Sequence, residues 1–238
     1  MKAIFLVTLC ILASVAGING ALGAPLLSDP AKKVLFLSPW ERWVPTWNLK
    51  DYVSTFELAG HSVDMVSNEN ASISFLMTQL GTYDIIIIRT ESFYIEGLNY
   101  YCSGEPVTVK SRTTFASLIS EKEIAVSQCI GFSLKFLQQY YPPGTLKHGL
   151  VYVVGGPAGD LSQAFLVGGA AVFVGYDDPY SLEWGRMDAL SQALFRNLLQ
   201  GSSVRDGISD LYVYLCRAHG EAGNWPMLTW QGDGDFKI

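Results

Sequence analysis

Cysteine and histidine, the residue types best suited to nucleophilic and acid–base catalysis, are few and widely spaced in this sequence. No HExxH or CxxC motif is present, and the histidines lack the spacing of metal ligands. One Cys–His pair shares a face of a predicted helix, but such a surface pair lacks an orienting third group and an oxyanion hole. We therefore expect no metal site. In chain order the cysteines and histidines of the sequence are Cys10, His61, Cys102, Cys129, His148, Cys216 and His219.

Other motifs that carry chemistry are missing as well. No GxGxxG follows the first predicted strand and no GxxxxGKS/T occurs, so nucleotide binding has no support. Gly-x-Ser-x-Gly, the usual serine-hydrolase turn, does not occur. Charged residues make up 16% of the chain, the net charge is −6, and no cluster of lysine and arginine offers a face for phosphates. We expect no cofactor and no nucleic-acid partner.

The most regular stretch runs from His148 to Pro179 and predicts two buried strands joined by a glycine turn and a short helix. The preceding chain alternates strands and helices, which predicts right-handed crossovers and a parallel sheet. We expect a three-layer α/β domain with helices on both faces of the sheet. The predicted strands are Val34–Leu37, His61–Val66 at an edge, Tyr83–Ile88 at the centre, Leu150–Val154 and Ala171–Val174. The predicted helices are Leu49–Leu58, Ile73–Leu80, Phe132–Leu137, Leu161–Val167, Trp184–Leu199 and Ser203–Ala218.

Three segments are less regular. Glu105–Val109 and Glu123–Gln128 predict short strands, which could form a hairpin beside the sheet. Met227–Trp230 and Phe236–Ile238 predict a closing strand pair around an acidic glycine turn. An aromatic loop that contains Trp40, Trp43 and Trp47 could line a groove for peptide or sugar, or could fold as a lid onto the core.

The N-terminus has the features of a secretory signal. Lys2 precedes the apolar run 3–16, and a segment of small residues follows. Cleavage after Gly23 fits best, and cleavage after Gly17 is an alternative. The apolar run is shorter than the ~20 residues that a membrane-spanning helix needs. We expect a signal peptide at 1–23, a linker at 24–33, one domain at 34–238, and a secreted or cell-surface protein without a membrane span in the mature chain.

An exported chain with Cys102, Cys129 and Cys216 can form one disulfide and keep one free thiol. The sequence does not select the pair, and all of them could instead be small buried hydrophobic residues. Asn70 begins a glycosylation sequon in a predicted surface loop. The sequon's Ser72 could equally be the cap of the following helix.

The residues that follow the predicted strands define a possible cleft, because ligands of open α/β sheets bind outside the carboxyl ends of the strands. Acidic residues there could hold a hard cation through their oxygens. They also have structural alternatives: Asp177 could turn the chain before Pro179, and Arg89 could pair with Glu91 or Asp84. The candidate cleft residues are Arg89, Glu91, Ser92, Gly155, Gly156, Asp177, Asp178, Trp40 and Trp43.

The order of these elements resembles the caspase-like fold of caspases, gingipains, clostripain and CHAT-domain proteins. The local match runs from Gln163-Ala164-Phe165-Leu166 to Gly175-Tyr176-Asp177-Asp178, with Gly232-Asp233 near the end of the chain. The resemblance covers Val34 to Ile238. It implies a catalytic histidine after the third strand and a nucleophilic cysteine after the fourth.

Those two positions fall at Glu91 and Gly156, and neither matches. A glutamate is not a neutral imidazole base, and glycine has no nucleophile. The resemblance therefore implies an exported pseudo-peptidase that acts as a binding or structural module for a peptide or protein partner. The alternative is an active cysteine endopeptidase with a relocated pair, Cys129 or Cys102 with His148 or His219.

Overall fold

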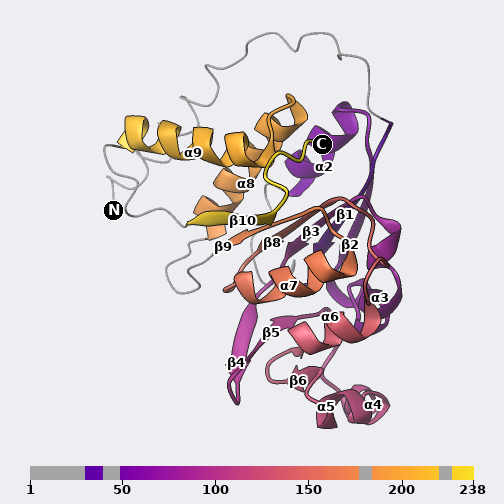
Figure 1. Cartoon of the computed structure of the whole chain (residues 1–238). Helices are drawn as coiled ribbons and strands as arrows, with labels where there is room; N and C mark the ends of the chain where they lie inside the picture. The colour runs from indigo at the N-terminus through magenta and orange to yellow at the C-terminus, as the bar shows by residue number, and fades with distance from the viewer. Residues whose placement is uncertain (1–29, 40–48, 177–183, 220–226) are drawn as a thin grey trace. The chain divides into compact units, whose positions relative to one another are not determined.

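A six-stranded, mostly parallel sheet forms the centre of the computed structural model, which describes residues 30–39, 49–176, 184–219 and 227–238. The order of its strands is β10-β9-β8-β3-β1-β2, and only β10 runs antiparallel to its neighbour (Figure 1). The strands are β1 (Lys33–Ser38), β2 (Ser62–Ser67), β3 (Ile85–Arg89), β8 (Leu150–Val154), β9 (Val172–Tyr176) and β10 (Leu228–Gly232).

Helices cover both faces of this sheet (Figure 1). Side chains alternate along each strand, so Phe36 of β1 packs into one core cluster and its neighbour Leu37 into the other. The face of Phe36 is covered by α2 (Leu49–Leu58), α8 (Trp184–Leu199) and α9 (Val204–His219). The face of Leu37 is covered by α3 (Ile73–Thr78), α6 (Leu134–Tyr140) and α7 (Gly159–Gly168). The predicted three-layer α/β architecture is confirmed.

The polarity of each strand matches its place in the sheet. Ile85 to Ile88 of β3 are buried between β1 and β8, as the uninterrupted apolar run predicts. At the edge, β2 exposes Asp64 and Met65, as its mixed polarity predicts. Two 3-10 turns, η1 (Asn68–Asn70) and η2 (Leu80–Thr82), flank α3.

A second, antiparallel sheet with the order β4-β5-β7-β6 is inserted between β3 and β8. Its strands are β4 (Ser92–Ile95), β5 (Leu98–Cys102), β6 (Ile124–Val126) and β7 (Ile130–Phe132). The strand predicted within Glu123–Gln128 is β6, but the strand predicted at Glu105–Val109 is wrong. Thr108 instead begins α4 (Val109–Thr114) with a capping box to Ser111, and α5 (Ala116–Ser120) follows.

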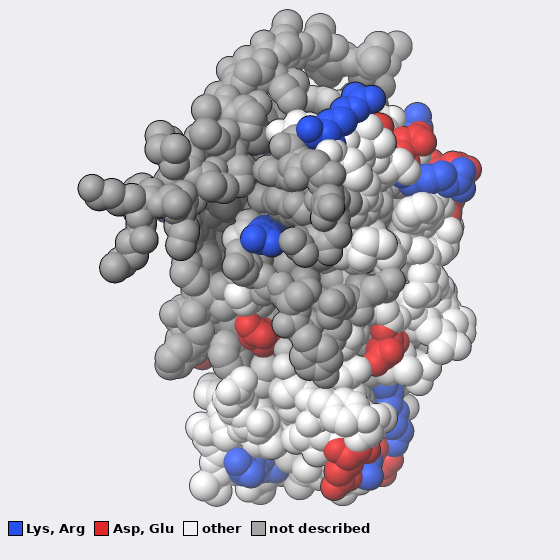
Figure 2. Space-filling model, turned by 90° about the vertical axis from the view of Figure 1, so that its left-hand side faces the viewer, with Lys and Arg blue, Asp and Glu red and all other residues white. Residues whose placement is uncertain are grey.

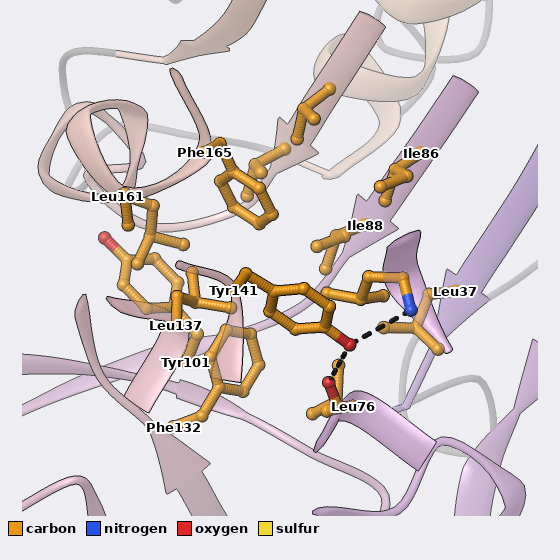
Figure 3. Packing of buried hydrophobic residues seen from close by; sticks show 14 of the residues in the cluster. Leu37, Leu76, Ile86, Ile88, Tyr101, Phe132, Leu137, Tyr141, Leu161 and Phe165 are labelled. Atoms are coloured by element: carbon orange, nitrogen blue, oxygen red, sulfur yellow. Dashed lines mark hydrogen bonds between the residues drawn. The ribbon is translucent and has the colours of Figure 1, made fainter. Parts of the chain in front are cut away.

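Tyr141, the C-cap of α6, joins α6 to α3 within the core. Its hydroxyl donates to the carbonyl of Leu76 at 2.5 Å and accepts from the backbone N–H of Leu80 at 3.1 Å (Figure 3). Burial raises the pKa of this phenol to about 12. The hydroxyl is therefore neutral at ordinary pH and satisfies two backbone groups that would otherwise lack partners.

The closing strand pair predicted for the tail is wrong. Leu228–Gly232 forms β10 alone, beside β9 in the main sheet. The residues after it turn back onto the first turn of α9, where Val204 N–H donates to Phe236 O at 3.0 Å and Arg205 N–H to Gly234 O at 2.8 Å. The tail follows this path because the N-terminal amides of a helix need acceptors.

Residues Ala31–Ile238 form one compact unit. The predicted signal peptide at 1–23 and most of the predicted linker at 24–33 lie outside the described residues. No helix in the described part of the chain combines the length and the apolar character needed to cross a bilayer.

Candidate functional site

The exits of β3 and β8 lie side by side at the carboxyl edge of the main sheet. Arg89 is in register with Val154, and Thr90 N–H donates to Val154 O at 2.9 Å. Glu91 and Gly156 follow at these neighbouring exits. The structure therefore places together the two positions at which the family resemblance implies a histidine and a cysteine.

Glu91 is engaged with the first turn of α8. Its Oε1 accepts a hydrogen bond from Trp184 Nε1 at 2.9 Å. The indole ring of Trp184 also stacks on Arg89, with the guanidinium carbon 4.4 Å from the ring centroid. The half-buried carboxylate therefore fixes a helix to the strand exit, and it is not placed next to a thiol.

The β8 exit has no room for a nucleophilic side chain. Gly155 and Gly156 have φ of +104° and +67°, a region that L side chains rarely adopt. A Cβ at Gly155 would lie 1.9 Å from the carbonyl oxygen of Thr90, and a Cβ at Gly156 would lie 2.2 Å from Ser92 Oγ. The close approach of the two exits thus requires glycine at both positions.

Arg89 pairs with Asp188 of α8, not with Glu91 or Asp84 as expected. Two parallel hydrogen bonds of 3.0 Å join its Nε and Nη2 to the carboxylate oxygens of Asp188, and the exposed fractions of the two residues are 2% and 6%. The candidate cleft residue Arg89 is therefore a buried link between β3 and α8. It offers no accessible charge to a ligand.

Phenols and a hydroxyl extend this buried polar layer. Tyr152 and Ser191 hydroxyls lie 2.5 Å apart, Tyr152 and Tyr176 hydroxyls 3.1 Å apart, and Tyr52 donates to the carbonyl of Asp188. Burial raises the pKa of Tyr52, Tyr152 and Tyr176. All of these phenols are therefore neutral at ordinary pH, which suits a structural network and excludes them as general bases there.

The cysteines and histidines do not meet among the described side chains. Cys102 and Cys129 form a disulfide, so neither is a free thiol. The alternative prediction of a catalytic pair that uses Cys129 or Cys102 with a histidine is therefore wrong. His148 is exposed just before β8, at the amino end of that strand and away from Gly156. Cys216 is a free, exposed thiol on α9, and the side chain of His219 lies outside the described residues. Of the outcomes left open for the three cysteines, one disulfide with one free thiol is the one observed.

Several predicted site residues lie outside the described residues, namely Trp40, Trp43, Trp47, Asp177 and Asp178. In the described ranges, no group of three or more His, Cys, Asp or Glu side chains could hold a metal ion. Asn70 is exposed at the end of η1, and Ser72 caps α3 by accepting from Phe75 N–H at 3.2 Å. The predicted helix cap is confirmed, and glycosylation of Asn70 stays a prediction.

The charged side chains described on the face shown in Figure 2 stand singly or in small groups of mixed sign. No extended block of one sign is visible in the described part of that face.

Sequence reasoning missed Trp184 and Asp188 as partners of the strand exits. The signal was present in the helical spacing, because Trp184, Asp188, Ser191 and Phe195 follow i, i+4, i+7 and i+11 and so share a face of α8. A charged residue within an otherwise buried helical stripe indicates a buried partner of opposite charge.

No protein-family model matches the sequence. No curated protein matches it either. Among solved structures, the chain is similar to the crystal structure of the initiator caspase Dronc of Drosophila, with 9% sequence identity and a TM-score of 0.42. The match covers 86% of this chain and 80% of the caspase chain. At this level of identity, the likeness concerns only the arrangement of helices and strands.

Proposed function

We propose that this chain is an exported, non-catalytic relative of the caspase- and gingipain-like cysteine peptidases, and that it acts as a binding or structural module for a peptide or protein partner. The observation that carries the proposal is Gly156. It stands at the β8 exit, where the resemblance implies the nucleophile, with a positive φ and with Ser92 in the space of a Cβ.

Two further observations support the proposal. The carboxylate of Glu91 is hydrogen-bonded to Trp184, so the neighbouring exit holds a structural contact where the resemblance implies a base. The disulfide between Cys102 and Cys129 fits an oxidising compartment, since such bonds rarely persist in the cytosol. It supports export, and it leaves Cys216 as the free thiol of the described chain.

Labelling with a thiol-reactive peptide probe tests the proposal. In the folded chain 24–238 without reductant, we expect labelling at Cys216 alone. Its rate should equal that of a small alkylating reagent that carries no peptide. Cys216→Ser should remove this labelling and leave the fold intact, because the residue is exposed. Labelling of another cysteine that is accelerated by the peptide, accompanied by peptide cleavage, would overturn the proposal.

A further inference from the structure

Asn70-Ala71-Ser72 is the only Asn-x-Ser/Thr tripeptide of the sequence, so an N-linked oligosaccharide has one acceptor in this chain. Asn70 is exposed at the end of η1, shortly after β2, the edge strand of the main sheet (Figure 1). An exposed turn accommodates a bulky, polar modification of this kind. The folded chain therefore has room for an oligosaccharide on Asn70.

The other two residues of the tripeptide are engaged in the fold. Ser72 is half-buried, and its Oγ accepts from Phe75 N–H at 3.2 Å as the cap of α3. Ala71 is fully buried, and its carbonyl accepts from Gly104 N–H at 2.7 Å. An enzyme that must bind the hydroxyl of Ser72 together with the amide of Asn70 cannot reach both groups in the folded chain.

The loop that closes over this tripeptide comes later in the chain. Gly104 approaches η1 so closely that a Cβ there would lie 1.6 Å from the carbonyl oxygen of Asn68. Next to it, buried Ser103 donates through its N–H and its Oγ to one carbonyl of β7, at 2.9 and 2.6 Å. The Cys102–Cys129 disulfide joins the same two segments. Because synthesis runs from the N-terminus, the tripeptide is made before the loop and the disulfide that close over it.

We propose that Asn70 carries an N-linked oligosaccharide and that it is attached before the chain folds, because the folded chain closes its own acceptor. In this transfer Asn70 Nδ2 attacks the anomeric carbon of a lipid-linked oligosaccharide diphosphate. A C–N bond forms and the bond from that carbon to the diphosphate oxygen breaks. Nδ2 passes one proton to a base of the transferase, the lipid diphosphate leaves as an anion, and nothing is oxidised or reduced. The proposal rests on export, which is part of the proposed function.

Expression in cells that glycosylate their secreted proteins tests the site. Two forms are compared, the full chain and residues 24–238 behind a signal peptide of proven function. We expect both to be secreted with a mass above that of the polypeptide, and peptide N-glycosidase should remove the excess and leave aspartate at position 70. If neither form carries the oligosaccharide, the proposal is overturned. If only the form with the proven signal carries it, the site stands and export by the chain's own N-terminus is overturned.

Two substitutions of Ser72 separate the acceptor tripeptide from the helix cap. Ser72→Asp keeps a good cap for α3 but removes the tripeptide, so this variant should be secreted without the oligosaccharide. Ser72→Thr keeps both the cap and the tripeptide and should be secreted with it. Asn70→Gln removes the acceptor amide, and an oligosaccharide that persists in this variant would overturn the assignment to Asn70.

A purified oligosaccharyl transferase, supplied with a lipid-linked oligosaccharide diphosphate, tests the order of events. A blocked peptide of residues 66–76 should accept the oligosaccharide. The folded, disulfide-bonded chain made in bacteria should accept it at least about tenfold more slowly, because the segment must first open locally. Equal rates for peptide and folded chain would show that the fold does not close the acceptor, and a peptide that accepts nothing would overturn the tripeptide as an acceptor.

Discussion

Trp184 Nε1 donates a hydrogen bond to Glu91 Oε1 at 2.9 Å, and the same indole ring stacks on the guanidinium of Arg89. One side chain of α8 thus contacts both polar residues at the β3 exit. Because Arg89 is also paired with Asp188, one turn further along α8, the helix is fixed to the sheet at two levels. At the β3 exit, where the fold would place catalytic residues, the polar side chains therefore attach α8 to the sheet.

The buried pair of Arg89 and Asp188 should show strong coupling in unfolding experiments. Asp188→Asn leaves the guanidinium buried without its counter-ion, so we expect a loss of ~3–5 kcal/mol in the free energy of unfolding by urea. The double variant Arg89→Met/Asp188→Leu should lose much less than the sum of the losses in Arg89→Met and Asp188→Leu measured singly, because neither charge is then left alone. Additive losses would contradict this account of the pair.

A matched control for this cycle lies at the surface. Glu96 and Lys122 form an ion pair of 2.8 Å in which both side chains are largely exposed. Since solvent screens such pairs, Glu96→Gln should leave the unfolding midpoint almost unchanged. The comparison separates the effect of burial from that of charge pairing itself.

The glycine at the β8 exit should resist substitution for two separable reasons. Gly156→Ala adds both backbone strain at φ +67° and a clash with Ser92, so we expect a loss of at least ~2 kcal/mol in the free energy of unfolding. Gly60 has φ +88° with no atom near its Cβ position, so Gly60→Ala should show the strain alone, ~1 kcal/mol. Adding Ser92→Gly should restore part of the stability lost in Gly156→Ala and none of that lost in Gly60→Ala. If Ser92→Gly restores no stability to Gly156→Ala, the clash with Ser92 does not cause the loss.

His61 should make the stability of the fold depend on pH. Burial and the nearby charge of Lys32 lower the pKa of this imidazole, whose Nδ1 accepts from Lys32 N–H at 3.2 Å. The pKa of His61 in the folded chain thus lies below the unfolded value of about 6.5. Neutral His61 therefore contributes its full stabilisation above about pH 6.5, and this contribution is lost as the pH falls through the folded pKa. We therefore expect the urea midpoint to decrease as the pH falls below about 6.5, the pKa of the unfolded imidazole.

A variant that accepts the same hydrogen bond without titrating tests the assignment to His61. In His61→Asn this part of the pH dependence should disappear, because the amide oxygen can accept from Lys32 N–H but does not bind a proton. His148→Asn, at an exposed position before β8, is the control and should keep it. A slope that persists in His61→Asn would assign the effect to another group.

The disulfide should contribute strongly to stability. Cys102 and Cys129 are separated by 27 residues in sequence. Closing a loop of this length lowers the entropy of the unfolded chain and stabilises the fold by ~3 kcal/mol. We expect Cys102→Ala/Cys129→Ala, or reduction of the native chain, to lower the free energy of unfolding by about this amount. Cys216→Ser should leave the free energy of unfolding almost unchanged. An equal loss in Cys216→Ser and in Cys102→Ala/Cys129→Ala would argue against a disulfide between Cys102 and Cys129.

The parts of the fold that could be predicted are those whose signal is local. The four isoleucines of β3 and the valines of β8 mark buried strands by themselves, and the spacing of Leu190, Leu194 and Leu198 marks α8. The second sheet was less visible because β6 and β7 have three residues each, and because β7 depends on pairing with distant β5 while β6 pairs with β7 alone. The first hairpin of this sheet turns at Glu96 and Gly97, which both have positive φ. The glycine at position 97 was the sequence signal for this two-residue turn.

The site divides in the same way. Residue types at the strand exits could be read from the sequence, so the positions of Glu91 and Gly156 were identifiable. Their partners could not be read, because Trp184 lies 93 residues beyond Glu91. The closeness of Ser92 to Gly156 also depends on how the β4 hairpin leaves the sheet. A sequence therefore indicates which side chains reach an edge more readily than it indicates what occupies the space between them.

The antiparallel strand β10 has a consequence for handling the protein. It pairs with β9, whose Val172, Phe173 and Val174 are buried. Removing the chain from Leu228 onward would leave this apolar strand with an unpaired row of amides and carbonyls, which is a template for aggregation. Strand β10 thus protects the edge of β9 from pairing with other chains. Chains that lack it should be recovered as insoluble aggregate and not as monomer.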